Sequence, residues 1–443
     1  MIGISEQSTV LPLSAAQRGV WFGHLLDPSS YAYNIGQYTE IGGEIDLSCF
    51  EKAAAHVLAG TEALRLNIFE AEAGLFQSIS PQVVGVLVVV DVSDEPDPHH
   101  AALAIMRVEL VRPFDLACNP LVRWRLIRLA PNHFYWLQVN HHIAVDGYAG
   151  SLIAQRMAQS YTALVKGESL PEWPCVYESL IEADQRYPGS EHEAVDRAYW
   201  HALLEDREPA QAWSGLSNSN GKAFVRRTVL LSPKLTEWLR KSDGPGLGAW
   251  LILAAARLQA LHDRNADVVL GMPLLGRFGK LERATPSMAS NVGHLRLDLS
   301  PHILISDLAD DINRRIRTAL RHQKYPHEAL QREFSPETRR GLVAFSVNLS
   351  SFDYGLEFGN LKTLTHNLSN GSIEGLSLNV YDQADSSTLR LDLNGNSELY
   401  EEKDLASYLA MLVQLLEGLA EVPAHSVATT PLALLALTPP ADL

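Results

Sequence analysis

The sequence has few cysteines and no long apolar run, and these two absences exclude several classes of protein. Its three cysteines, Cys49, Cys118 and Cys175, form no CxxC pair. Thiols this sparse do not build a disulfide framework or a structural zinc site, so we expect no bound metal and a cytoplasmic location. Apolar stretches such as Val83–Val90 are far shorter than the ~18 residues of a membrane span. The N-terminal segment also lacks the basic residues and the apolar stretch of a signal peptide.

Positive charge is also scarce. The chain has 36 Lys and Arg against 52 Asp and Glu, which gives a formal net charge of −16. This balance argues against a nucleic-acid partner or an anionic membrane surface, because both need a basic face. Hydrophobic residues make up 46% of the chain, so the bulk of it folds around a core.

The chain is long enough for more than one domain, and its elements alternate between helix and strand from end to end. At 443 residues, the length favours two or three domains. Pro, Gly, Ser and Asn cluster between Gly167 and Gly221, which marks a connection between two halves. We therefore predict an α/β (α+β) fold with an N-terminal lobe at 1–175, a C-terminal lobe at 176–425 and a linker toward a following domain at 426–443.

One motif stands out, the segment 140–147 with the sequence NHHIAVDG. Side chains alternate between the two faces of a strand, so His142 shares a face with Asn140 and Gln138. His141 shares the other face with apolar neighbours. We expect His142 to act in a polar site and His141 to be structural.

Asp146 and Gly147 follow the strand, just before a predicted helix. A carboxylate there can bind backbone N–H groups, pair with an arginine or orient a ring, and we favour an architectural role for Asp146. Adjacent strand histidines do not easily chelate one metal ion, which weakens a zinc interpretation.

Other catalytic signatures are missing from the sequence. It has no GxSxG elbow, Walker A loop or HExxH motif. The glycines of 244–248 indicate a loop before a helix rather than a phosphate site. A histidine base without a protein nucleophile favours direct transfer, in which a substrate amine or hydroxyl attacks an activated acyl group.

Several segments together resemble a known family, the condensation domains of non-ribosomal peptide synthetases, within the chloramphenicol-acetyltransferase-like superfamily. They occur in the family's order: 11–21 (LPLSAAQRGVW), 62–65 (EALR), 114–123 (FDLACNPLVR), the HHxxxDG segment, 271–277 (GMPLLGR), 290–295 (SNVGHL) and 322–328 (HQKYPHE).

The resemblance implies two similar lobes that form a V-shaped pseudo-dimer with a central tunnel. It implies that His142 faces the acceptor nucleophile, and that Asp146 pairs with Arg277 of the second lobe, with Arg65 a lesser contributor. The N–H of Gly147 would help to position a substrate or an oxyanion. Further candidate contacts in the tunnel are Asn140, Gln138, Tyr148 and Asn291.

The same resemblance implies an acyltransferase that forms an amide bond between a thioester-activated acyl or aminoacyl donor and a carrier-tethered aminoacyl acceptor. No cofactor is permanently bound, and the phosphopantetheine arm of a carrier protein, or acyl-CoA, carries the substrate. The expected partners are carrier domains upstream and downstream, with an adenylation domain following.

Alternatives remain open. The start at Met1, ten residues before the first motif, also fits a starter condensation domain that uses acyl-CoA. We consider three other functions less well supported: an epimerisation domain, a non-catalytic recruitment platform and a stand-alone acetyltransferase-like enzyme. A heterocyclising relative is disfavoured, because that branch replaces the two histidines with carboxylates.

Overall fold

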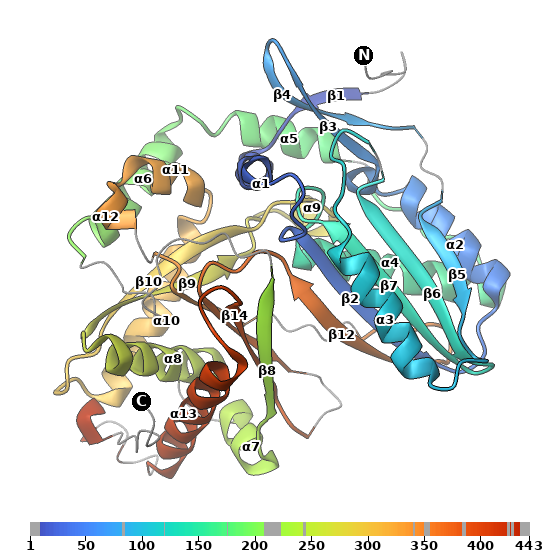
Figure 1. Cartoon of the computed structure of the whole chain (residues 1–443). Coiled ribbons are helices and arrows are strands. Elements are labelled where there is room, and N and C mark those ends of the chain that lie inside the picture. The colour runs from blue at the N-terminus through green and yellow to red at the C-terminus, as the bar shows by residue number, and fades with distance from the viewer. Residues whose placement is uncertain are drawn as a thin grey trace. The chain divides into compact units, whose positions relative to one another are not determined.

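A computed structural model describes residues 9–434 except 82–84, 119, 175, 208–222, 242–244, 340–341, 350–354, 383–386, 423–425 and 427–428. Contacts divide the chain into two compact units (Figure 1). Unit 1 comprises Met1–Gly189, Leu275–Ser290 and Tyr354–Gly371, and unit 2 comprises Ser190–Leu274, Asn291–Asp353 and Ser372–Leu443.

Unit 1 contains a five-stranded sheet with the strand order β12-β2-β7-β6-β5 and a three-stranded sheet with the order β1-β4-β3. Its strands are β1 (Thr9–Pro12), β2 (Asn34–Gly42), β3 (Leu66–Ala71), β4 (Gly74–Ile79), β5 (Leu87–Asp91), β6 (Val122–Ala130), β7 (His133–His141) and β12 (Lys362–Asn370). Its helices are α1 (Ala15–Leu26), α2 (Leu47–Ala59), η1 (Glu62–Arg65), α3 (Pro98–Val111), α4 (Gly147–Lys166), α5 (Tyr177–Gln185) and α9 (Lys280–Ala284).

Local capping explains where the helices of unit 1 begin. Ser14 and Gln17 form a reciprocal capping box at α1, and Asp46 accepts the N–H of Cys49 at α2. Asp97 caps α3, whose first turn contains Pro98. The helix α4 ends at Gly167, which adopts a left-handed conformation with φ of 70°.

The two faces of the five-stranded sheet have different covers. Helix α3 packs on one face, across β2, β6 and β7 (Figure 1). Helices α2 and α4 cover the other face, where Phe50 of α2 contacts both Trp136 of β7 and Tyr161 of α4. Trp124 of β6 packs edge-on against Trp136 with ring centroids 5.5 Å apart. Large aromatic side chains therefore hold α2 and α4 to the sheet face that carries Trp136.

Unit 2 contains a six-stranded sheet with the order β10-β9-β11-β13-β14-β8, in which β11 pairs in parallel with β9 and β13 and the other pairs are antiparallel. Its strands are β8 (Phe224–Leu230), β9 (Asp267–Leu274), β10 (Asn291–Asp298), β11 (Phe345–Asn348), β13 (Leu376–Tyr381) and β14 (Arg390–Asn396). Its helices are α6 (Glu191–Leu204), α7 (Pro233–Lys241), α8 (Leu247–Asp263), α10 (Ile305–Arg321), α11 (His327–Glu333), α12 (Pro336–Arg339), α13 (Glu402–Glu421) and η3 (Leu432–Leu434).

The core of unit 2 is built around α8. Every residue from Ala249 to Ala256 is buried, as expected of a helix that is apolar all round. Helices α10 and α13 both contact α8, and apolar side chains of β9 and β14 complete the cluster. Gly246 lies in a loop before α8 with φ of 84°. The sequence predicted a loop before a helix for the glycine-rich stretch 244–248, of which Gly244 lies outside the described residues.

The mixed α/β class predicted from the sequence is confirmed, whereas the units are less contiguous than the predicted lobes. By contacts, unit 1 extends to Gly189 and includes the connection between β9 and β10 together with β12. Residues 429–434 of the predicted linker belong to unit 2, because Ile305 donates its N–H to Thr430 and Leu432 is fully buried. Residues 435–443 lie outside the described part of the chain. Among the described helices, none is long and apolar enough to cross a membrane.

Candidate active site

The two histidines of the motif lie at the end of β7, with His141 its last residue and His142 just past it. His141 is 1% exposed and packs edge-on against His24 and Phe114, with ring centroids 5.3 and 6.0 Å away. Its Nδ1 accepts the N–H of Ile143 at 3.2 Å. Burial holds the pKa of His141 well below its ordinary value, with His24 acting in the same direction. His141 is thus part of the packed interior of unit 1, and its structural role stays a prediction.

His142 is half-buried and is held by backbone contacts. Its N–H donates to Tyr33 O at 2.8 Å. Gly371 lies against the ring, because a Cβ placed on this glycine would be 2.8 Å from Cδ2 of His142. Burial lowers the pKa of His142 and Asp146 partly opposes this effect. The imidazole is therefore neutral at neutral pH, the form that can accept a proton.

Asp146 is the N-cap of α4 and is almost fully surrounded by donors. Its carboxylate accepts the N–H groups of Ala149, Ala289 and Ser290 at 2.8, 3.0 and 2.9 Å. Both terminal nitrogens of Arg277 also donate to it, at 2.8 and 3.1 Å, in a pair whose side chains are 1% and 2% exposed. Burial alone would raise the pKa of Asp146, but Arg277 and the backbone donors bring it below its ordinary value. The structure thus contains the predicted ion pair between Asp146 and Arg277. The geometry of this pair suits a structural role for Asp146 rather than a role in proton transfer.

Arg277 belongs to unit 1, which corrects the expectation that it comes from the second lobe. The connection between β9 and β10 folds around Asp146 and is therefore part of the unit that contains the motif. Arg277 also donates to Ser287 O at 2.8 Å. Gly276 has φ of 66°, and a Cβ there would meet Ala289 O at 1.8 Å, so the turn requires glycine.

Tyr148, in the first turn of α4, reinforces the same connection. Its hydroxyl donates to Arg283 O at 3.0 Å, and the guanidinium of Arg277 lies 5.0 Å from its ring centroid. Tyr148 therefore ties the start of α4 to the segment that holds Asp146, rather than standing free as a substrate contact.

Gln138 and Asn140 lie on the face of β7 opposite to that of His141. Gln138 is fully buried, and neither polar atom of its amide has a partner among the described residues. Asn140 is 4% exposed, and its Oδ1 is likewise unpartnered within the described part of the chain. Such buried and unsatisfied amides are costly unless something else binds them.

Two other candidate site residues, Asn291 and Arg65, form their hydrogen bonds away from the motif. Asn291 of unit 2 donates to the backbone carbonyls of Gln323 and Tyr325 at 2.9 and 2.6 Å, so its amide clamps a loop. Arg65 donates to Ser80 O at 2.5 Å and is not among the partners of Asp146. The expectation that Arg65 contributes to the Asp146 pair is wrong, because the guanidinium is directed at carbonyls at the end of β4.

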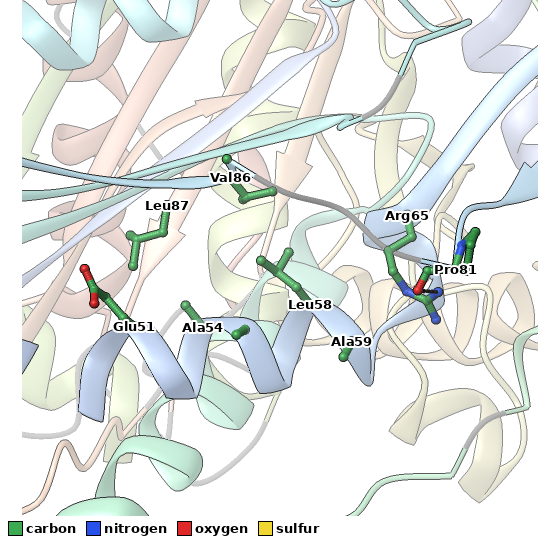
Figure 2. A pocket seen from close by; sticks show the side chains of 10 residues that line it. Glu51, Ala54, Leu58, Ala59, Arg65, Pro81, Val86 and Leu87 are labelled. Carbon is green, nitrogen blue, oxygen red and sulfur yellow. Dashed lines mark hydrogen bonds between the residues drawn. The ribbon is translucent and has the colours of Figure 1, made fainter. Parts of the chain in front are cut away.

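Arg65 lines a separate pocket of about 340 Å³ in unit 1. Figure 2 shows Ala54 and Leu58 of α2 on one side of this pocket and Val86 and Leu87 on the other. Glu51 and Arg65 lie toward its two ends (Figure 2). Its lining is apolar apart from these two side chains, and it contains none of the motif residues.

The sequence did not reveal two parts of the site. Gly371 and the backbone of 287–290 come from segments more than a hundred residues after the motif, and each touches it only through tertiary contact. The string Ser369-Asn370-Gly371 indicates a turn, but one sequence does not say which side chain packs on that turn. Among the described residues no cluster of His, Cys, Asp and Glu suits a metal ion.

Comparisons with known proteins agree on one family. The family model of the condensation domain matches residues 7–435. The chain is 38% identical over 411 residues to the dimodular nonribosomal peptide synthase of Bacillus subtilis (strain 168). The aligned region covers 91% of this chain and 17% of that protein. It is 36% identical over 429 residues to the isonitrile lipopeptide synthase of Streptomyces coeruleorubidus, covering 95% of this chain and 29% of that protein. The chain therefore spans less than a third of the length of either relative.

Solved structures resemble the whole chain. A variant of the starter condensation domain of rhizomide synthetase RzmA, in complex with C8-CoA, matches with a TM-score of 0.88 and 35% identity over 96% of this chain and 97% of that one. The first condensation domain of the calcium-dependent antibiotic synthetase matches with a TM-score of 0.88 and 26% identity over 97% and 99% of the two chains.

These matches confirm the chloramphenicol-acetyltransferase-like fold that the motifs predicted. The family model and both kinds of relative point to one activity, the transfer of an acyl group to an amine with formation of an amide bond. The chain thus belongs to the condensation-domain family of nonribosomal peptide synthetases.

Proposed function

We propose that this domain joins a thioester-bound acyl group to the amine of a carrier-tethered aminoacyl group, with His142 acting on the amine. The observation that carries the proposal is the half-buried, neutral imidazole of His142 at the entry to α4. Its ring lies against Gly371, and its backbone N–H donates to Tyr33 O.

The reaction requires an acceptor amine that is neutral and loses a proton. The amine lone pair attacks the thioester carbonyl carbon, the C–N bond forms and the C–S bond then breaks. The proton leaves the nitrogen for the imidazole and passes to the departing thiolate, so the products are an amide and a thiol. An imidazole whose pKa is lowered by burial accepts this proton transiently without staying charged.

The start of α4 supports stabilisation of the developing oxyanion. Gly147 is the first residue of this 20-residue helix, and the Asp146 carboxylate already occupies the N–H of Ala149. The positive end of the helix dipole and the N–H of Gly147 favour negative charge beside the motif. The ion pair of Asp146 with Arg277 fixes the position of this helix end.

The test is single-turnover amide formation by wild type and His142→Ala, with an acyl thioester and a loaded acceptor carrier. We expect the substitution to reduce the rate about 10²- to 10⁴-fold, the range of a lost general acid–base group. His133→Ala is the matched control, because His133 lies on the same strand and bonds Glu40 rather than the motif. A near-normal rate for His142→Ala would remove the catalytic role.

The donor of this domain is, we propose, an acyl group delivered by coenzyme A, as in a starter condensation domain. Similarity to the starter domain bound to C8-CoA supports this choice over an aminoacyl donor. Gly150 in α4 supports it further, since it is buried yet a Cβ there would meet no atom within 4 Å, which leaves room for a chain. Acyl-CoA and a loaded upstream carrier, supplied separately, distinguish the two donors by which one yields amide.

The assembly around the domain belongs to the same proposal. The aminoacyl acceptor is carried on the phosphopantetheine arm of a downstream carrier domain, an adenylation domain loads that carrier, and the reaction takes place in the cytoplasm. Support comes from the relatives, which are several times longer than this chain and are named as peptide synthases. Amide formation should therefore require a loaded acceptor carrier and fail with a carrier that lacks the arm.

A further inference from the structure

A second pocket of unit 1, with a volume of about 480 Å³, is rich in arginine. It lies at the end of α3 and along β6, where Arg112, Arg123 and Arg125 line it. The rest of its lining consists of Gly85, Pro113, Phe114, Asp115, Pro120 and Val122. None of these residues belongs to the motif. We call this cavity the arginine pocket.

Three guanidinium groups share one carboxylate beside the arginine pocket. Arg123 and Arg125 lie on the same face of β6, which α3 covers, and Glu109 of α3 meets both. Arg125 donates to Oε1 of Glu109 through its Nε at 2.9 Å. Arg112 and Arg123 both approach Oε2, with nitrogen–oxygen distances of 2.9 and 3.7 Å. A single carboxylate therefore does not neutralise the three positive charges.

The one acid in the lining of the pocket does not restore the balance. Asp115 is exposed, and its Oδ1 accepts the N–H of Ala117 at 3.0 Å. Three arginines against Asp115 and Glu109 leave one positive charge in excess around the pocket. The whole chain has a formal net charge of −16, so this local excess is opposite in sign to the net charge. Such a cavity attracts anions at close range, within about a Debye length.

Arg123 adds a second, independent observation, a buried donor without a partner. Its side chain is 8% exposed, and its guanidinium carbon lies 3.7 Å from the ring centroid of Phe114. One terminal nitrogen donates to Arg112 O at 2.6 Å at the end of α3. The Nε group has no hydrogen-bond partner among the described residues. Burial lowers the pKa of Arg123 to about 10, and the charge of Arg112 acts in the same direction. A bound anion would oppose both effects.

We propose that the arginine pocket binds an organic phosphate monoester, as a ligand separate from the substrates of the proposed reaction. A phosphate group accepts several charge-assisted hydrogen bonds, and the planar guanidinium donates such bonds in pairs. The remaining wall is apolar and suits the carbon part of an ester; it consists of Pro113, Phe114, Pro120 and Val122. A volume of about 480 Å³ lies in the range of small-molecule sites, roughly 300–1,000 Å³, and exceeds what a bare ion fills.

The probes that test this site are phenyl phosphate, inorganic phosphate and phenol, titrated into the whole chain by calorimetry at low salt. For wild type we expect one phenyl phosphate per chain with a Kd of about 1 mM or lower. Inorganic phosphate should bind about tenfold more weakly, because it makes no contact with the apolar wall. Phenol should give no saturable heat, because it lacks the anion. Absence of saturable phenyl phosphate binding, or equal affinity for the two phosphates, would overturn the inference.

Arg112→Gln is the decisive variant. The Arg112 side chain is 52% exposed, and Glu109 keeps its two other arginine partners, so the fold should persist. We expect phenyl phosphate binding to weaken about tenfold. Arg128→Gln is the matched control, because Arg128 lies on the same strand, is 38% exposed, pairs with Asp91 and does not line the pocket. Both substitutions change the net charge equally, so equal losses of affinity would show that anions bind through the general field and would overturn the site.

Urea unfolding supplies a second measurement and establishes that each variant is folded. A ligand that binds only the folded domain raises the urea midpoint, so phenyl phosphate should raise it more in wild type and Arg128→Gln than in Arg112→Gln. The KM of the acyl thioester should be the same in both variants. A KM raised only in Arg112→Gln would place the pocket on the path of the substrate and overturn the claim of a separate ligand. If wild type forms no amide at all, the proposed function fails, whereas these binding results still decide the site.

Discussion

Removing Arg277 tests whether the buried ion pair holds the site together. In Arg277→Met the carboxylate of Asp146 stays 2% exposed and loses the two guanidinium hydrogen bonds at 2.8 and 3.1 Å. Breaking a buried pair from one side typically costs about 3–5 kcal/mol. Three backbone N–H groups still solvate Asp146, so we expect the lower end, about 3 kcal/mol.

The sign of the pH dependence follows from the pKa of Asp146. In wild type this pKa lies below its unfolded value, so the carboxylate stabilises the fold above about pH 4, and this contribution is lost as the pH falls further. Without Arg277 the pKa of Asp146 loses two lowering influences, and we expect burial, which is the largest influence on it, to raise it above its unfolded value. The variant then loses stability as the pH rises, so its deficit relative to wild type grows from about pH 4 to about pH 7.

The assay is urea unfolding at about pH 5 and about pH 7, followed by the intrinsic fluorescence of the eight tryptophans, which lie in both units. Arg296→Met is the control, because Arg296 makes a two-pronged pair with Asp267 at 2.8 and 2.7 Å, but with 21% and 34% of the side chains exposed. Its loss should cost about 1 kcal/mol or less. The reasoning is refuted if both variants lose the same stability, or if the deficit of Arg277→Met does not change with pH.

Three further predictions concern the surroundings of the motif. The rate of amide formation at saturating acceptor should fall as the pH is lowered, with a midpoint below about 6.5. The reason is that burial lowers the pKa of His142 and that only the neutral imidazole accepts a proton. A midpoint above about 6.5 in a pH–rate profile would contradict this prediction. Gly371→Ala should reduce kcat about tenfold, because the new Cβ would press on the His142 ring. The free energy of unfolding should fall by only about 1–2 kcal/mol, the cost of an alanine at φ of 96°. An unchanged kcat in steady-state assays would show that the ring tolerates displacement. Gly276→Ala should destabilise unit 1 by about 3 kcal/mol, because residue 276 has φ of 66° and the new Cβ would overlap Ala289 O. A urea midpoint equal to that of wild type would show that the turn relaxes.

Local chemistry explains why much of unit 1 and the motif could be predicted. Alternation along β7 predicted that His141 lies in the core, and the structure buries it. His142 follows the strand and is half-buried, with Gly371 against its ring. The helix expected near Tyr148 begins at Gly147 and ends at Lys166, because Asp146 and Gly167 are strong local cap signals. The pairing of Asp146 with Arg277 followed from the family resemblance, not from any local pattern.

The wrong or incomplete expectations concern residues whose partners are distant in sequence. Arg65 was expected near Asp146, but its guanidinium has closer carbonyls at Ser80 and Pro81. Arg277 was assigned to the second lobe by its position along the chain, yet its segment is bonded into unit 1. Chain order does not report which unit a long connection packs on.

The sequence by itself determined the family, the α/β class, and the histidine, aspartate and helix start of the motif, because these depend on residue types at short spacings. The tertiary structure alone decided that Gly371 backs the His142 ring and that the connection between β9 and β10 wraps Asp146. These features arise from packing between segments far apart in the chain. Their energies depend on burial and on which donor meets which acceptor, and neither quantity exists until the chain is folded.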